Sequence, residues 1–372
     1  MLAFVLLLSV LIIAHEFGHF IVAKRSGVRV EKFAIGFGPV LYRRKGKETE
    51  FSIRAFPLGG YVKMAGDSRT DCHGKPDEFF AKSVGTKMAI VFAGPLFNYI
   101  LGFIVFWIIA VMGFPYIDTV VGKLKPGFPA QAAGLKEGDK ILTVNGKAVE
   151  DWMEMTSLIR NSKNKVVLKV SRDASTLSLD VNLKSDEIRD EYGRKKAASL
   201  IGIEASPKIK VVRYNVFEGF FHAGKELFRL TAIIVKGFYD MFSGSIPLKE
   251  AVTGPLGIYY ITSEAVKVGI LALLHLMTGL SVSLAIVNLL PLPLLDGGHI
   301  VLFLIEKIRG KQLTENAEDL LTRVGYAIFA ILIAFVFYND VSKFGSKLWG
   351  PKSAQSGNAG AGASGAAAKD GK

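Results

Sequence analysis

The first 23 residues form an almost unbroken apolar run that carries three ionisable side chains. As a helix, this run is long enough to cross a hydrocarbon core of roughly 30 Å. It contains His15, Glu16 and His19 as the pattern HEFGH. Positions i and i+4 share one face of a helix, so the two histidines can bind one metal ion while Glu16 lies beside them. The pattern predicts a membrane helix with two zinc ligands and a carboxylate that accepts a proton from water. The alternative is histidines that hydrogen-bond a neighbouring helix, although ionisable groups at this depth usually have a function.

Composition places the chain among multi-pass membrane proteins. Half of its 372 residues are hydrophobic and its mean hydropathy is +0.34. The net charge of +13 does not indicate nucleic-acid binding, because many basic residues flank the apolar runs. The single cysteine, Cys72, excludes an intrachain disulfide, and we expect no metal site at Cys72 and His73. The N-terminal run lacks a basic start and a small-residue cleavage site, so we expect a retained span.

A basic segment follows the first span. From Lys24 to Lys87 there are fourteen Lys or Arg residues against seven Asp or Glu. The positive-inside rule therefore predicts a cytoplasmic loop at 25–85, with the metal motif near the inner end of the first helix. Short β-branched and aromatic runs predict strands, with 40–44 paired to 50–54. Such a sheet is either a cytoplasmic flap or, as its apolar turns favour, a segment that dips into the membrane.

The second predicted span, 86–113, contains Gly94, Pro95 and Asn98. One interpretation is a proline kink with a close helix contact. The other is that the small residues let this helix approach the first one, with Asn98 hydrogen-bonding near the metal site. The sequence leaves both open.

A soluble composition from 115 to 207 predicts an α/β domain outside the membrane. The runs Phe128-Pro-Ala130, Ala133-Gly-Leu135 and Gly138-Asp-Lys-Ile141 resemble a bacterial PDZ domain, a module that binds extended chain ends. We expect its groove loop near 116–122. The following segment, 208–263, begins with an amphipathic helix that we expect on the outer leaflet, where His222 would snorkel or cap.

The third span, within 264–303, leads into Asp296. Because the PDZ-like domain is expected outside, this helix runs inward. Asp296 is therefore expected at the same side of the membrane as the HEFGH motif. Catalytic zinc usually has three protein ligands and one open position, which His15, His19 and Asp296 would provide. The alternative is that Asp296 caps the next helix, with Gly297 and Gly298 forming the bend. His299 is a candidate for a hydrogen bond that holds Asp296.

The predicted fold is a multi-pass α-helical membrane protein with four transmembrane helices, a cytoplasmic-side re-entrant β-loop and an inserted extracytoplasmic α/β PDZ domain. The expected boundaries are: 1–24 first helix, 25–85 β-loop, 86–113 second helix, 115–207 PDZ domain, 208–263 amphipathic helix and connection, 264–303 third helix, 304–323 cytoplasmic loop, 324–339 fourth helix, and 340–372 disordered tail.

Together these motifs resemble the site-2 protease family of intramembrane zinc metalloproteases, especially bacterial regulators that cleave anti-sigma factors. The resemblance rests on HEFGH, on Gly94-Pro95 with Asn98, on the PDZ insertion, and on the run from Asn288 to Gly297, NLLPLPLLDG. It implies that His15, His19 and Asp296 bind zinc, that Glu16 is the general base, and that Asn288 contacts the substrate backbone or stabilises an oxyanion. Supporting positions near the ligands would be Asn98, Gly94, Pro95, Pro293 and His299.

The resemblance further implies that the 33–64 loop pairs with substrate as an added strand. Expected partners are single-pass membrane proteins of the anti-sigma-factor type, cut first outside the bacterial inner membrane, and membrane lipid; no nucleic acid is expected, and the oligomeric state is left open. Some family members carry two PDZ domains, whereas this chain has room for one. The alternative function is a non-catalytic scaffold that recruits partners through the PDZ domain, which predicts no stoichiometric zinc. A metal transporter fits poorly, because ligands at one membrane face offer no path across.

Overall fold

The computed structural model describes residues 1–173, 175–189, 195–311 and 315–349, and it separates into two compact units. The helical unit comprises Met1–Trp107 and Ala223–Lys372, and the inserted unit comprises Ile108–His222. Within the described residues, four helices are long and apolar enough to cross a membrane: Leu2–Arg25, Val84–Met112, Ile270–Asn288 and Leu320–Phe344. The number of spans agrees with the prediction.

In the helical unit, α1 (Leu2–Arg25) and α2 (Val84–Met112) approach each other at a glycine. A Cβ atom on Gly18 would lie 2.2 Å from the backbone oxygen of Ala93. No other residue fits there without moving a helix backbone, because nonbonded heavy atoms stay more than about 3 Å apart. The glycine of HEFGH is therefore a packing requirement for α1 against α2.

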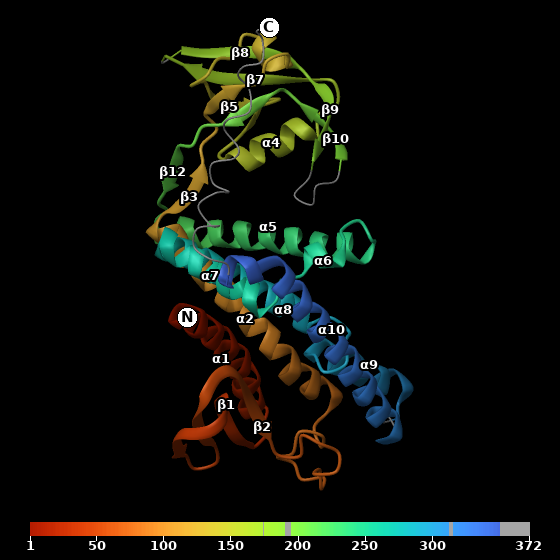
Figure 1. Ribbon diagram of the computed structural model, residues 1–372. Coiled ribbons are helices and arrows are strands. Elements are labelled where there is room, and N and C mark those ends of the chain that lie inside the picture. The colour runs from red at the N-terminus through yellow and green to blue at the C-terminus, as the bar shows by residue number, and fades with distance from the viewer. Residues whose placement is uncertain (174, 190–194, 312–314, 350–372) are drawn as a thin grey trace. The chain divides into compact units, whose positions relative to one another are not determined.

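The loop between these helices holds a bent antiparallel ribbon of β1 (Val30–Lys45) and β2 (Glu50–Met64), which lies beside α1 (Figure 1). The β1 residues 32–35 pair with both 50–53 and 60–63, and 40–45 pair with 50–54. The predicted hairpin of 40–44 with 50–54 is confirmed. The ribbon is thus a small sheet in the order 40–45, 50–54, 30–35, 60–64, and its bends contain Gly36 and Gly38 with φ of +87° and +83°.

The rest of the helical unit consists of further helices: α5 (Val216–Phe242), which begins in the inserted unit, α6 (Leu248–Ala251), α7 (Pro255–Val268), α8 (Ile270–Asn288), α9 (Asp296–Arg309) and α10 (Glu315–Trp349). The amphipathic stretch is a helix as predicted, and its place on a leaflet stays a prediction. Within the predicted segment 264–303, the membrane span is α8, which follows the end of α7 and precedes the start of α9. Gly269, with φ of +130°, separates α7 from α8.

The loop predicted at 304–323 is wrong for most of its length, because α9 continues to Arg309 and α10 starts at Glu315. Glu306 of α9 is 5% exposed, hydrogen-bonds Arg69 and lies 3.6 Å from the Nζ of Lys87. The Lys87 ammonium also sits over the ring of Phe303, at 4.6 Å from its centroid. Arg69 and Lys87 are distant in sequence, and their contacts bury Glu306 on one face of α9. This burial stabilises the polar segment as a helix.

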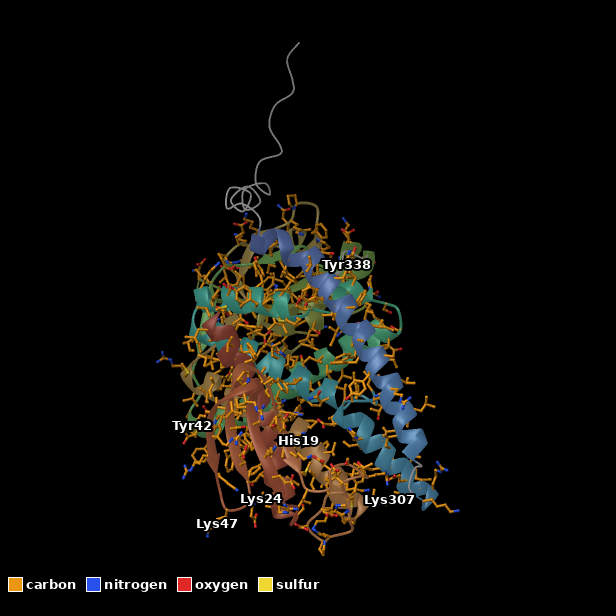
Figure 2. All side chains as sticks on the ribbon, turned by 60° about the horizontal axis from the view of Figure 1, so that its bottom comes forward. His19, Lys24, Tyr42, Lys47, Lys307 and Tyr338 are labelled. Carbon is orange, nitrogen blue, oxygen red and sulfur yellow. The ribbon has the colours of Figure 1, made fainter. Side chains whose placement is uncertain are left out.

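The fourth span is longer than the predicted 324–339, and the predicted tail at 340–372 is helical up to Trp349; residues 350–372 lie outside the described residues. Asp340 is fully buried and accepts hydrogen bonds from the backbone N–H groups of Gly254, Leu256 and Gly257 at 2.8, 2.9 and 3.1 Å. The carboxylate of α10 thereby caps the first turn of α7. In Figure 2, Lys24, Lys47 and Lys307 lie at one end of the helical unit and Tyr338 of α10 lies toward the other.

The inserted unit is an α/β domain built on a four-stranded antiparallel sheet in the order β6-β5-β7-β8. Its elements are β3 (Phe114–Ile117), β4 (Val121–Leu124), α3 (Pro129–Ala132), β5 (Lys140–Val144), β6 (Lys147–Ala148), α4 (Trp152–Arg160), β7 (Lys165–Arg172), β8 (Ser175–Asn182), β9 (Lys184–Arg189), β10 (Lys195–Leu200), β11 (Ile203–Ala205) and β12 (Ile209–Val212). Figure 1 shows α4 next to this sheet. Because β12 pairs with β3, the unit extends beyond the predicted end at 207.

His222 belongs to the inserted unit and does not snorkel or cap. It is 8% exposed, its Nε2 lies 2.7 Å from the Tyr116 hydroxyl, and its ring stacks on Tyr214 at 4.3 Å between centroids. The histidine joins the start of α5 to the β3–β12 pair, where aromatic neighbours explain its burial.

Candidate metal centre

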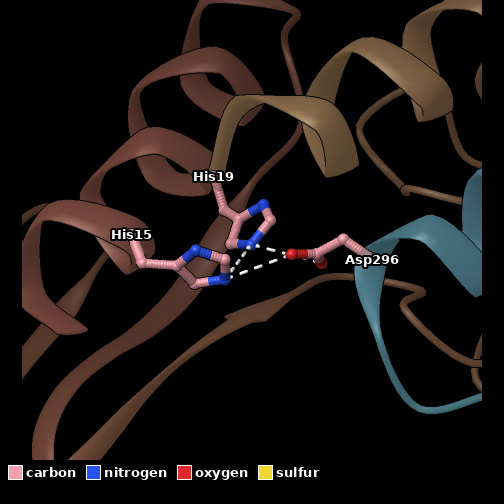
Figure 3. Close-up of side chains that lie close together, drawn as sticks. All are labelled: His15, His19 and Asp296. Carbon is pink, nitrogen blue, oxygen red and sulfur yellow. Dashed lines mark hydrogen bonds and ion pairs between the residues drawn. The ribbon is translucent and has the colours of Figure 1, made fainter. Parts of the chain in front are cut away.

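The two histidines of HEFGH converge on the same side of α1. Their imidazole rings face each other (Figure 3), and their Nε2 atoms are 3.2 Å apart. The Nδ1 of His19 is 2.9 Å from the backbone oxygen of Ile90 in α2. A carbonyl oxygen only accepts, so Nδ1 carries the proton, and the lone pair of His19 Nε2 faces His15.

Asp296, the first residue of α9, completes the group. Its Oδ2 lies 3.2 Å from His15 Nε2 and its Oδ1 lies 3.5 Å from His19 Nε2 (Figure 3). The N-cap residue of α9 is Leu295 and Asp296 is the first residue inside the helix, so Asp296 does not occupy the capping position. The three side chains are 13, 12 and 16% exposed, in the order His15, His19, Asp296.

The turn before α9 delivers Asp296 to this position. Gly297 and Gly298 lie in the first turn of α9 rather than in the bend, which corrects the alternative considered from the sequence. A Cβ on Gly297 would lie 2.2 Å from the Leu289 oxygen, and one on Gly298 would lie 2.2 Å from the Leu292 oxygen. The glycines therefore let residues 289–295 fold back against the helix that carries Asp296.

The donor set fits a zinc ion. Ligand atoms of a tetrahedral zinc with bonds of 2.0–2.2 Å are about 3.3–3.6 Å apart, close to the 3.2 and 3.5 Å that separate each histidine Nε2 from its nearer Asp296 oxygen. Two imidazole lone pairs and a carboxylate repel one another at this range, and a shared cation or proton relieves that repulsion. In the described part of the chain, His15, His19 and Asp296 are the one group of three such residues whose ligand atoms all lie within 4.8 Å.

Gly94 of α2 forms the wall behind the ligands. A Cβ there would lie 2.3 Å from His19 Nε2 and 2.8 Å from His15 Cε1. Pro95 follows it, buried inside α2, where its missing N–H leaves a gap in the helical hydrogen bonds. The sequence left the role of this pair open, and the structure supports the close approach of α2 to the histidines.

Two asparagines face the other nitrogen of His15. The amide nitrogens of Asn98 and Asn288 each lie 3.5 Å from His15 Nδ1. Pro293 packs instead against α10, since a Cβ on Gly325 would lie 2.4 Å from the Pro293 Cβ. His299 lies on α9 with its ring 6.4 Å from that of Phe303, and its role in holding Asp296 stays a prediction.

Glu16 lies beneath the last segment of the β-ribbon. Its carboxylate lies close to the backbone N–H of Val62. A Cβ on Gly60 would lie 3.3 Å from Glu16 Cγ and 3.3 Å from Ile12 Cγ2. Sequence reasoning did not single out Gly18 or Gly60; glycines inside an apolar helix and a strand were the available indications of close backbone contact.

The inserted unit has a cavity of about 210 Å³ between α4 and the β10–β11 segment. Its lining includes Lys125, Phe128, Trp152, Arg160 and Gly202. The groove expected near 116–122 is not part of this cavity. Residues 121–124 form β4, which pairs with β11.

Comparison with known proteins assigns the family. The sequence model of peptidase family M50 matches residues 3–332. The chain belongs to peptidase family M50. This is the site-2 protease family, and the M50 chain described here is a zinc-dependent intramembrane metalloprotease with several apolar spans.

Named relatives agree over nearly the whole M50 chain. The zinc metalloprotease RasP of Geobacillus kaustophilus is 30% identical over 422 residues, covering 92% of this chain and 98% of the relative. The regulator of sigma-E protease RseP of Escherichia coli is 29% identical, with the same coverage of both chains. A candidate zinc metalloprotease of Clostridium acetobutylicum is 36% identical, covering 91% of this chain and 96% of its own.

Among solved structures, the PDZ domain of an SdrC-like protein from Listeria monocytogenes is 24% identical. It covers 24% of the M50 chain and 88% of its own, with a TM-score of 0.20. A likeness this low carries no argument. The inserted unit is instead characterised by its own strand pairing and by its PDZ-like motifs.

Proposed function

We propose that this M50 protease cleaves the transmembrane segment of single-pass membrane proteins of the anti-sigma-factor type, after a first cut outside the membrane. The observation that carries the proposal is the meeting of His15, His19 and Asp296 from α1 and α9. Those three residues would hold the zinc ion. When bound, zinc supplies a Lewis acid that activates water and polarises a carbonyl.

Glu16 would perform the proton transfers. It is adjacent to His15 in the chain, and its contact with the Val62 N–H keeps it oriented. As general base it accepts a proton from the attacking water, and it then gives that proton to the leaving amide nitrogen. The amide of Asn288 would hydrogen-bond the substrate carbonyl, where negative charge develops.

The β-ribbon would present the substrate. A transmembrane helix hides its carbonyls in its own hydrogen bonds, so it must unwind before hydrolysis. The segment 60–64 is an edge of the small sheet, since the described strands pair with it only through 30–35. An unwound substrate could add there as another strand, next to Glu16.

The inserted unit would act on the substrate's outer part. Its cavity carries the positive side chains of Lys125 and Arg160, which suit the carboxylate of a trimmed chain end. A variant that lacks residues 118–207 but keeps β3 and β12 distinguishes two roles of the inserted unit, capture of chain ends and exclusion of bulky substrates. Loss of cleavage supports capture of chain ends, whereas cleavage of untrimmed substrates supports exclusion of bulky ones.

The proposed location is the bacterial inner membrane, with the metal centre near the cytoplasmic side and the inserted unit outside. The basic residues between α1 and α2 support this orientation by the positive-inside rule. Labelling of single cysteines at Lys47 and Lys147 with a membrane-impermeant thiol reagent, in a Cys72→Ser background, tests it. Intact cells should label the Lys147→Cys variant alone.

The deciding experiment is Glu16→Gln in the full-length, detergent-purified protein. We expect one zinc per chain to remain and cleavage of a model transmembrane substrate to fall at least ~10²-fold. Glu137→Gln, an exposed change of the same kind in the inserted unit, serves as the control. If the Glu16→Gln variant cleaves at the wild-type rate, Glu16 is not the base; if the wild type binds no zinc, the scaffold function is favoured.

A further inference from the structure

Asn98 and Asn288 both face the same atom of His15, its Nδ1. Asn98 comes from the middle of α2 and Asn288 is the last residue of α8, yet both amide nitrogens lie 3.5 Å from His15 Nδ1. The nitrogen and oxygen of an amide have nearly the same shape, so hydrogen bonding decides which one faces the ring.

Metal binding by His15 decides where its proton lies. The Nε2 atom faces His19 and Asp296 at 3.2 Å, so it is the atom available to a cation. A ligating Nε2 carries no proton, and the neutral ring then holds its proton on Nδ1. That N–H needs an acceptor, which an amide oxygen is and an amide nitrogen is not. An amide nitrogen facing Nδ1 would instead place the proton on Nε2 and block the metal.

The surroundings of the two amides differ. Asn98 is 0% exposed, and its Oδ1 is buried without a hydrogen-bond partner when Nδ2 faces His15. Turning the amide gives Oδ1 the Nδ1–H of His15. The turned amide satisfies the buried Oδ1, whose missing partner would otherwise cost about 1–3 kcal/mol, while Nδ2 takes the buried position that Oδ1 leaves.

Asn98 is also the more firmly held of the two. Its backbone oxygen accepts a hydrogen bond from Ser281 Oγ at 2.7 Å. One turn later, a Cβ on Gly102 would lie 2.9 Å from Val282 Cγ2, so α2 and α8 are in close contact around this residue. Asn288 is half-buried at the end of α8, where the regular helix stops.

We propose that Asn98 is the positioning residue that keeps His15 in the Nδ1–H form, which leaves the Asn288 amide to hydrogen-bond the substrate. The role of Asn98 rests on the site geometry, and the role of Asn288 rests on the proposed function. Asn98 would thus orient a metal ligand from α2, a helix that supplies none of the three ligands. Zinc affinity would depend on Asn98, and substrate binding would depend on Asn288.

The test compares Asn98→Leu, Asn98→Asp and Asn288→Leu in the full-length protein. Zinc affinity is measured by competition with a chelator, and the proton position on His15 by ¹⁵N NMR of the zinc-loaded protein. Asn98→Leu removes the acceptor and should weaken zinc binding ~10–100-fold. Asn98→Asp keeps an oxygen acceptor and should restore the affinity to within about threefold of wild type. Asn288→Leu should leave zinc affinity unchanged and lower kcat/KM for the model substrate.

Unchanged zinc affinity in Asn98→Leu would overturn the proposal, as would a loss of zinc affinity in Asn288→Leu that equals or exceeds it. If Asn98→Leu does not fold, Asn98→Ser makes the same measurement, because its short hydroxyl does not reach the ring. Zinc affinity is independent of cleavage, so the role of Asn98 survives even if Glu16→Gln shows that the proposed chemistry is wrong.

Discussion

Gly94→Ala is the smallest change that tests the metal centre. The added methyl would lie 2.3 Å from His19 Nε2, 2.5 Å from His19 Cε1 and 2.8 Å from His15 Cε1. Nonbonded carbon contacts lie at about 3.5–4.0 Å, so the imidazole rings must retreat by roughly 1 Å or α1 must move away from α2. The second route would break the close packing of Gly18 against the backbone of Ala93.

The size of the effect follows from this displacement. Metal sites tolerate about ±0.2 Å in ligand distance, and a 1 Å misplacement at a catalytic centre costs ~10²-fold in rate. We expect zinc affinity and kcat/KM each to fall at least ~100-fold, equivalent to about 2.7 kcal/mol. Chelator competition and cleavage of a model transmembrane substrate, both in detergent, measure the two quantities.

Gly85→Ala is the matched control on the same helix. A Cβ at Gly85 meets no atom within 4 Å. Each substitution replaces a helical glycine by alanine, which favours the helix by up to about 1 kcal/mol, so neither should lose helix content. Gly85→Ala should retain zinc and activity. If Gly94→Ala binds zinc as tightly as Gly85→Ala does, the close contact of Gly94 with His15 and His19 is contradicted.

Two further changes test the packing of each unit. Glu306→Ala leaves Arg69 and Lys87 without their shared carboxylate and should destabilise the helical unit by about 3–5 kcal/mol. Thermal unfolding in detergent measures this change, with Glu264→Ala, whose side chain is 47% exposed, as the control. Equal melting temperatures of the two variants would contradict the buried network. In the inserted unit, the Arg172 guanidinium 2.7 Å from Asp139 lowers the pKa of that carboxyl. A pKa below its unfolded value means that the contribution to stability is present above about pH 4 and is lost as the pH falls through the folded value. The protection of residues 135–141 against hydrogen exchange, relative to the intrinsic rate at each pH, should therefore fall in acid for the wild type and already be reduced at neutral pH for Arg172→Met.

Several features of the chain could be predicted because they depend on local spacing. The i, i+4 histidines on an apolar helix and the paired segments 40–44 and 50–54 each follow from a few neighbouring residues. Asp296 required one more step, the order of the membrane spans, which placed it at the level of the HEFGH motif. These predictions use periodicity, hydropathy and turn chemistry, all of which are present in a linear sequence.

The errors have a common cause. The segment predicted as a loop at 304–323 and the predicted tail after 339 are polar, and polarity alone indicates exposure. Glu306 is instead buried against Arg69, which lies 237 positions earlier, and Asp340 caps a helix whose first residues lie more than 80 positions away. No local pattern identifies such partners.

The sequence by itself predicted the candidate ligands, the candidate base and the apolar helices that carry them. Only the tertiary structure decided which backbones touch, through Gly18, Gly60, Gly94 and Gly297, and which amides face His15. The physical reason is that a glycine or a buried charge acquires its meaning from atoms brought to it by folding, whereas helical spacing and hydrophobicity act along the chain itself.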